Sequence, residues 1–225
     1  MNSIQKSISI LGIAFTLTTT LSACNASGLP TVVSLNKAEA AYQEGVEKAS
    51  EKDCRGAIER YTDALRANPD YAEAYSNRGN AFFNLNHKEE AIKNYNRAIQ
   101  LDPELAEAFY NRGVALYQLG DRTQAIEDYT QALKLKPDYV QAYGNRAVAR
   151  SHMGDNQGAI EDYTQVLKYN PSLAEIYYNR GFSHNRAGNR QGAVQDLQKA
   201  IDLFSQQDNS AGVQKVRALL QQIQS

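Results

Sequence analysis

A segment of 34 residues recurs along this chain, and that period limits the fold more than any other feature of the sequence. Residues 72–105, 106–139 and 140–173 align without gaps. One proline per copy marks the period: Pro69, Pro103, Pro137 and Pro171. A fixed period in this range is typical of stacked repeats, each of which buries its apolar face only against its neighbours. The sequence therefore predicts an array of small units rather than one globular core.

Each copy contains two expected helices. In residues 106–139 the first helix should run from Ala106 to Leu119, and Gly120 follows it, a residue suited to the left-handed turn after a helix. The second should run from about Arg122 to Leu135. It should end before Pro137, because a proline disfavours helix in the residue before it.

The residues that recur in the copies have the order aromatic, Arg-Gly, apolar, Ala, Tyr and Pro. One copy has Tyr75, Arg78, Gly79, Phe82, Ala91, Tyr95 and Pro103, and the next has Phe109, Arg112, Gly113, Leu116, Ala125, Tyr129 and Pro137. This order resembles the tetratricopeptide repeat. The resemblance implies an all-α fold, a right-handed α-solenoid of tandem helix-turn-helix repeats. It covers five repeats: 38–71, 72–105, 106–139, 140–173 and 174–207.

Residues 208–225 should add one last helix that caps the array. Its apolar residues share one face at spacings of three and four: Val213, Val216, Leu220 and Ile223. Because an open end of a solenoid needs a cover, this face should pack on the fifth repeat.

The fourth and fifth repeats depart from the apolar pattern of the earlier copies. Arg150 and His184 stand at the place where earlier copies have Phe82 and Leu116, so looser packing is expected there.

Residues 1–23 differ from the array and have the composition of a signal peptide. Lys6 precedes an apolar run from Ile8 to about Leu21, which is too short for a membrane span of about 20 residues. The run ends in the letters LSAC, which resemble the cleavage box of bacterial lipoproteins and place a cysteine at Cys24. By that resemblance the Cys24 thiol receives a lipid that anchors the chain. The alternative is an ordinary secretory signal with a coincidental cysteine.

Residues 24–37 are expected to form the lipidated N-terminus and a tether. Asn25 to Asn36 contain Ser, Gly and Pro and show no helical period. A tether of this length reaches at most about 40 Å when extended. The resemblance then implies that the array stays close to a membrane of the bacterial cell envelope, on its periplasmic side.

Composition and spacing argue against several classes of function. The net charge is −1 and the charges are interspersed, which is no signature of nucleic-acid binding. His87, His152 and His184 lack metal-ligand spacing, and no glycine-rich phosphate loop follows a strand. We therefore expect no catalytic residue, no metal and no cofactor. Cys54 is either a small packing residue or a thiol that pairs with another chain.

Arginine recurs at the seventh place, counting from the first residue of each repeat. The second to fifth repeats have Arg78, Arg112, Arg146 and Arg180. Sixteen residues later the last three of these repeats have an acid: Asp128, Asp162 and Asp196. The first repeat exchanges the signs, with Glu44 and Arg60, and the second offers Asn94. A half-buried arginine needs a partner, so each pair is predicted to be a structural contact.

By the resemblance, the first helices line a concave groove, into which the fifth, sixth and twelfth places point. The sixth place holds Asn77, Asn111, Asn145 and Asn179. The fifth and twelfth places add Tyr42, Tyr110, Tyr178, Phe83 and Tyr117. An asparagine amide both donates and accepts hydrogen bonds, and the row is similar to the asparagine ladder of peptide-binding tetratricopeptide superhelices. The alternative is that these amides cap local backbone groups or face solvent.

Three functions remain open. The leading hypothesis is a membrane-anchored adaptor that binds protein partners, in particular an extended peptide segment, in the groove. The second is a scaffold of envelope assembly that associates with itself, for example as a homodimer. The third is an enzyme whose site the sequence does not reveal. Acidic chaperone tails are disfavoured, because the second, fifth and sixth places hold Glu, Tyr and Asn instead of the Lys and Arg that such tails require.

Lipidation at Cys24 predicts a clear effect of Cys24→Ser. Because serine lacks the thiol that carries the lipid, the variant should stay uncleaved or leave the membrane fraction. Electrophoretic mobility and membrane fractionation measure both outcomes. Unchanged processing and unchanged fractionation would contradict the lipoprotein interpretation.

Overall fold

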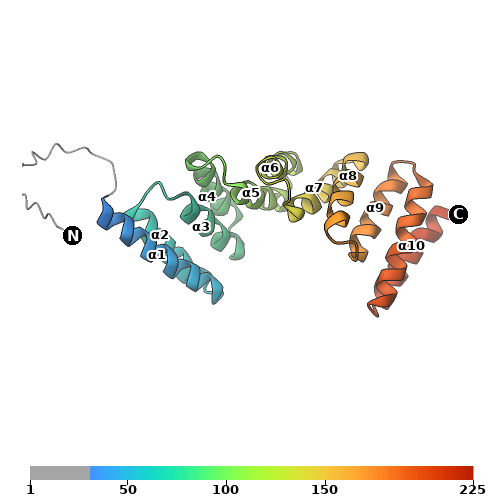
Figure 1. Cartoon of the computed structure of the whole chain (residues 1–225), viewed down its shortest axis with the longest axis horizontal. Coiled ribbons are helices and arrows are strands. Elements are labelled where there is room, and N and C mark those ends of the chain that lie inside the picture. Colours follow the sequence, from blue (N-terminus) through green and yellow to red (C-terminus); the bar gives the residue numbers. More distant parts are fainter. Residues whose placement is uncertain (1–30, 225) are drawn as a thin grey trace, which may run out of the picture.

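The structure of this chain is a computed structural model, and it describes residues 31–224. Within that range the chain forms eleven α-helices and no strand. The helices follow one another along one elongated array, with α1 at one end and the C-terminus at the other (Figure 1). The segment 1–23, Cys24 and the first half of the expected tether lie outside the described residues.

Ten of the helices form five consecutive pairs. The pairs are α1 (Val32–Ser50) with α2 (Cys54–Ala67), α3 (Ala72–Asn84) with α4 (Lys88–Leu101), α5 (Ala106–Leu119) with α6 (Arg122–Leu135), α7 (Val140–Met153) with α8 (Asn156–Tyr169), and α9 (Ala174–Arg186) with α10 (Arg190–Gln206). Each helix packs mainly against the helix before it and the helix after it. The predicted all-α solenoid is therefore confirmed.

The last helix, α11 (Ser210–Gln224), caps the fifth pair as expected. Val216 and Ile223 are buried against residues of α10, among them Phe204, while Val213 and Leu220 are half-buried at the edge of the same cluster. The apolar face that the sequence predicted is thus the face that packs.

The expected tether is wrong in its last part, because α1 begins at Val32 rather than after Asn36. The Thr31 hydroxyl oxygen accepts a hydrogen bond from the backbone N–H of Ser34 at 3.2 Å, which caps the helix. Val32 is 73% exposed and Val33 79% exposed. Since this first turn buries no face, its sequence carries no helical period, and the local cap sets the helix start.

A recurrent close contact between glycine and tyrosine joins the two helices of a pair. Tyr129 on α6 is 1% exposed and packs against Gly113 on α5. A Cβ added at Gly113 would lie 2.9 Å from a ring carbon of Tyr129. The same arrangement joins Gly45 to Tyr61 and Gly79 to Tyr95. The tyrosine ring therefore occupies the space that any larger residue in place of the glycine would need.

The predicted arginine pairs form in three repeats. Arg112 donates from Nη2 to Asp128 Oδ1 at 2.7 Å and from Nε to Oδ2 at 2.8 Å. The pairs Arg146–Asp162 and Arg180–Asp196 have the same two-bond geometry. Paired hydrogen bonds of this kind fix the arginine plane as well as its position.

The first two repeats show weaker versions of this contact. Arg60 and Glu44 meet at 3.5 Å on the surface, and Arg78 donates to the neutral Asn94 at 2.8 Å. Burial lowers the pKa of Arg78, whereas the hydrogen bond to Asp196 raises the pKa of Arg180. The second repeat therefore holds a half-buried cation whose partners are the neutral Asn94 and Thr62.

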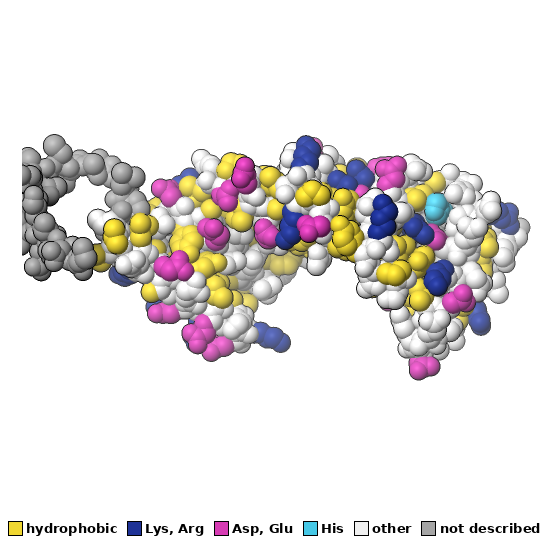
Figure 2. Space-filling view, in the orientation of Figure 1, with side chains coloured by type: hydrophobic (Ala, Val, Ile, Leu, Met, Phe, Trp, Pro, Cys, Tyr) yellow, Lys and Arg dark blue, Asp and Glu magenta, His cyan; other side chains and the backbone are white. Residues whose placement is uncertain are grey.

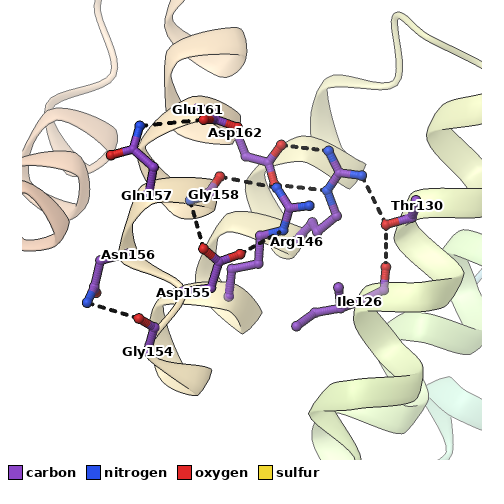
Figure 3. A network of polar contacts seen from close by, with 11 residues as sticks. Ile126, Thr130, Arg146, Gly154, Asp155, Asn156, Gln157, Gly158, Glu161 and Asp162 are labelled. Carbon is purple, nitrogen blue, oxygen red and sulfur yellow. Dashed lines mark hydrogen bonds and ion pairs between the residues drawn. The ribbon is translucent and has the colours of Figure 1, made fainter. Parts of the chain in front are cut away.

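The seventh-place arginine of each of the second to fifth repeats also contacts the preceding repeat, and the sequence analysis did not predict this contact. Arg146 donates from Nη1 to the Thr130 hydroxyl at 3.0 Å while it holds Asp162 on its other side (Figure 3). The equivalent bonds run from Arg78 to Thr62, from Arg112 to Asn96 and from Arg180 to Thr164. One guanidinium thus connects the second helices of two neighbouring repeats.

The looser packing expected at Arg150 is wrong. Arg150 donates from Nη1 to Asp162 Oδ2 at 2.9 Å and to the backbone oxygen of Gly158 at 3.2 Å. Asp162 therefore binds two arginines. His184, at the same place of the next repeat, lies 3.8 Å from Asp196, and burial lowers its pKa. Polar contacts replace the apolar ones at this place.

Replacing Gly113 by Ala should lower the free energy of unfolding by about 1–3 kcal/mol, because the new Cβ overpacks the Tyr129 ring. Gly144→Ala is the matched control. A Cβ there would have its nearest neighbour at 3.9 Å, so the control should be neutral or up to about 1 kcal/mol more stable. Denaturant unfolding measures both variants. Equal stability of the two would contradict the close contact.

Arg112 and Asp128 should show coupling in a double-mutant cycle. Removing Asp128 alone leaves a half-buried guanidinium whose remaining bond is to Asn96, and should cost about 2 kcal/mol. The double variant Arg112→Met with Asp128→Leu should cost less than the sum of the single variants by more than about 1 kcal/mol. Denaturant unfolding of the four proteins measures this coupling, and simple additivity would refute the interaction.

Candidate functional site

Three pockets lie along the first helices, each at a boundary between two repeats. Side chains from the ninth and twelfth places of one repeat and from the sixth and ninth places of the next repeat line each pocket. The tyrosine on the second helix of the earlier repeat lies at the bottom. The first–second pocket, about 220 Å³, is lined by Val46, Ala49, Cys54, Tyr61, Asn77, Asn80, Ala81 and Asn84. The second–third pocket, about 370 Å³, is lined by Asn80, Phe83, Asn84, Tyr95, Tyr110, Asn111 and Val114. The fourth–fifth pocket, about 200 Å³, is lined by Val148, Ser151, His152, Tyr163, Tyr178, Asn179 and Phe182.

The four asparagines of the sixth place fall into two classes. Asn77 donates to the Tyr42 hydroxyl at 2.8 Å, and Asn145 donates to the Tyr110 hydroxyl at 3.1 Å. Asn111 and Asn179 make no side-chain hydrogen bond within residues 31–224, and each lines a pocket. The expected uniform row is therefore an alternation of bonded and available amides.

The fifth place causes this alternation. Where the preceding repeat has a tyrosine, the asparagine 35 residues later reaches its hydroxyl. Before Asn111 that place holds Ser76, and before Asn179 it holds Gly144, and neither bonds the amide. Tyr110 is further held by ring contacts with Tyr139 at 4.7 Å and Tyr129 at 6.0 Å. Bonded asparagines thus support the wall, whereas the other two present their amides to the pockets.

The predicted aromatic residues also have different surroundings. Phe83 and Tyr110 line the second–third pocket together. Tyr178 lines the fourth–fifth pocket and is partly covered by Lys215 of α11, whose ammonium lies 4.3 Å from the ring centre. Tyr42 packs against Tyr71 at 4.8 Å and supports Asn77.

Tyr117 separates the pockets rather than lining one. Its hydroxyl lies 2.7 Å from Nδ1 of His152, and the two rings are stacked with centres 6.1 Å apart. This contact joins the third repeat to the fourth. It lies between two joined pockets over repeats one to three and a further pocket over repeats four and five.

The bottom of each pocket is a buried tyrosine of the second helix, which the sequence analysis did not place in the site. Tyr61 and Tyr163 are each 2% exposed, and Tyr95 is 1% exposed. The Tyr95 hydroxyl donates to Asn80 at 2.8 Å, but the hydroxyls of Tyr61 and Tyr163 have no hydrogen-bond partner within the described chain. Burial raises the pKa of Tyr61 to about 12, so this hydroxyl keeps its proton at neutral pH. The sequence signal was present: tyrosine occupies this place in four repeats where a purely apolar residue would pack equally well.

Charged side chains are absent from the linings of the three pockets. The acids of the second place are exposed, and Glu39 and Glu107 are bonded to Tyr71 and Lys136. Acidic and basic side chains are mixed over the face seen in Figure 2. Among residues 31–224 no group of three metal-ligating side chains occurs, and no helix there is long and apolar enough to cross a membrane.

Family models for the repeat match most of the array. The model described as "TPR repeat" matches residues 49–86, 85–120 and 151–188. Models described as "Tetratricopeptide repeat" match residues 106–139 and 174–207. This chain is a tetratricopeptide repeat protein. No curated protein matches it.

Solved structures with the same fold include other tetratricopeptide repeat proteins. MamA is 25% identical with a TM-score of 0.70, over 78% of this chain and 96% of that chain. YrrB, described as a TPR protein with an unusual peptide-binding site, is 22% identical with a TM-score of 0.70, over 79% of this chain and 90% of that chain. The first TPR domain of Spaghetti (RPAP3), bound to the HSP90 peptide SRMEEVD, is 25% identical with a TM-score of 0.54, over 56% of this chain and 98% of that chain.

The two classes of asparagine predict different effects of the same substitution. Asn145→Ala removes the hydrogen bond to Tyr110, whereas Asn111→Ala removes none. Asn145→Ala should therefore be less stable than Asn111→Ala by about 1 kcal/mol, or about 2–4 °C in melting temperature. Comparing the two variants cancels the gain in helix propensity that both share. Equal melting temperatures would contradict the division into bonded and available amides.

Proposed function

We propose that this tetratricopeptide repeat protein is a binding scaffold whose groove holds an extended segment of a partner protein. The observation that carries the proposal is the row of pockets at repeat boundaries, with the available amides of Asn111 and Asn179 on their walls. An extended segment has unpaired backbone donors and acceptors along its length, and side-chain amides match both. The structure of the Spaghetti (RPAP3) domain with its peptide supports this use of the fold.

The peptide of that structure is acidic, and a tail of that kind is not proposed here. The groove of this chain offers amides, hydroxyls and aromatic rings at the pocket walls. Two exposed acids of the second place, Glu73 and Glu39, lie near Tyr42. Burial is the main cause that raises the pKa of Tyr42, and these two carboxylates raise it further. An acidic segment would meet these carboxylates without a compensating cation.

We further propose that Cys24 anchors the scaffold by a lipid to a membrane of the cell envelope. The support is the cleavage-box sequence before Cys24 and the apolar run that precedes it. With the described array beginning at residue 31, only a few residues separate the anchor from α1. The groove would then act close to the membrane surface, and binding rather than catalysis would be its role.

The test is affinity capture from solubilised envelope with matched variants. Asn111→Ala with Phe83→Ala removes two lining groups of the second–third pocket. Gln131→Ala is the control, because Gln131 is exposed on α6, the second helix of the same repeat. A groove partner should be captured by the parent chain and the control, and lost with the groove variant. A partner that survives the groove variant but is lost on changing second helices would overturn the proposal.

A second candidate function is self-association, and the open face of the first repeat favours it. A cavity of about 530 Å³ lies between α1 and α2 and is lined by Ser34, Lys37, Ala40, Ala41, Glu44, Arg60, Asp63, Arg66 and Ala67. In later repeats the seventh place on this face contacts the preceding repeat. A second copy could cover the face here. Light scattering decides the point, since a monomer at concentrations well above those in the envelope would exclude this candidate.

A further inference from the structure

The first two pockets form one continuous site. They share Asn80 and Asn84, and the contact between Tyr117 and His152 lies beyond them, between the third and fourth repeats. We call this site, over repeats one to three, the joined pockets. A segment bound there would pass from the first–second pocket directly into the second–third pocket.

Every side chain that lines the joined pockets is uncharged at neutral pH or is the thiol of Cys54. Among them are the amides of Asn80, Asn84 and Asn111, and no Asp, Glu, Lys or Arg. A carboxylate or an ammonium group that entered either pocket would lose hydration without gaining an opposite charge. The joined pockets therefore select against charged side chains.

Several polar groups in the joined pockets have no partner within the described chain. Tyr61 is only 2% exposed, and its hydroxyl, at the bottom of the first–second pocket, makes no hydrogen bond there. Asn84 and Asn111 make no side-chain hydrogen bond there either. The Asn80 amide nitrogen has only a 3.5 Å contact with Asn77, which is too long for a good hydrogen bond. These groups offer donors and acceptors in nearly equal number.

We propose that the joined pockets bind an uncharged polar segment of a polypeptide, one whose pocket-facing side chains are serine, threonine, asparagine or glutamine. Hydroxyl and amide side chains both donate and accept, as do Tyr61 and the three asparagines. Such a segment provides a partner for the Tyr61 hydroxyl without bringing a charge out of water. This inference rests on the proposed function, since it specifies the partner of the same groove.

Selection from a library of random displayed peptides tests the specificity. The bait is the full chain carrying Cys24→Ser, so that Cys54 is its only thiol. The enriched sequences should be rich in serine, threonine, asparagine and glutamine and poor in charged residues. A consensus with a fixed acid or base would overturn this inference and leave the peptide-binding function standing. A selection that enriches nothing would overturn both.

Cys54 reports where the enriched peptide binds, because its thiol lines the first–second pocket. At a peptide concentration about ten times the dissociation constant, alkylation of Cys54 by a maleimide should slow about elevenfold, as only the free protein reacts. Alkylation at an unchanged rate would show that the peptide binds elsewhere and would overturn the assignment.

A charge introduced into the site should change its preference in a defined direction. Asn111→Asp keeps the shape of the side chain and adds a carboxylate, so selection on this variant should enrich lysine or arginine. Gln131→Glu adds the same charge on α6, outside the pockets, and should leave the preference of the parent chain unchanged. Equal shifts for both variants would show that net charge, and not the pocket, sets the preference.

Discussion

The array depends on one guanidinium in each of the second to fifth repeats that bonds in two directions. In the third to fifth repeats it holds a carboxylate on its own second helix with two short bonds, and it donates a further bond to the second helix of the preceding repeat. An aromatic residue of the fourth place lies beside it, such as Tyr143 at 5.7 Å from Arg146. Because a solenoid has contacts only between neighbours, a bond that spans each boundary adds to every interface on which the array depends.

Most of the fold could be predicted from the sequence because its causes are local and periodic. The prolines, the glycines of the turns and the small residues opposite the tyrosines each constrain a few neighbouring residues, and they recur every 34 residues. The first turn of α1 could not be predicted in this way. Its stability comes from the Thr31 cap, while its valines stay exposed, so no face is marked by burial.

The site was predicted less completely, since its behaviour depends on pairs of residues in different repeats. The row of asparagines is visible in the sequence, but the division into bonded and available amides follows from what stands 35 residues earlier, Tyr42 and Tyr110 or Ser76 and Gly144. Tyr95 and Tyr129 are visible in the sequence only as residues of the repeat motif. The geometry shows that Tyr61, Tyr95 and Tyr163 are buried and also line the pockets.

The contact between Tyr117 and His152 lies between the joined pockets and the fourth–fifth pocket, so the chain presents two sites side by side. One short motif can occupy the joined pockets while a second motif of the same partner occupies the other pocket. Two weak motifs joined by a flexible linker would then bind far more tightly than either alone, because the second binding event occurs at the high effective concentration that the linker sets. Partners with repeated short motifs would be retained over partners that carry one copy, even where each motif makes the same contacts.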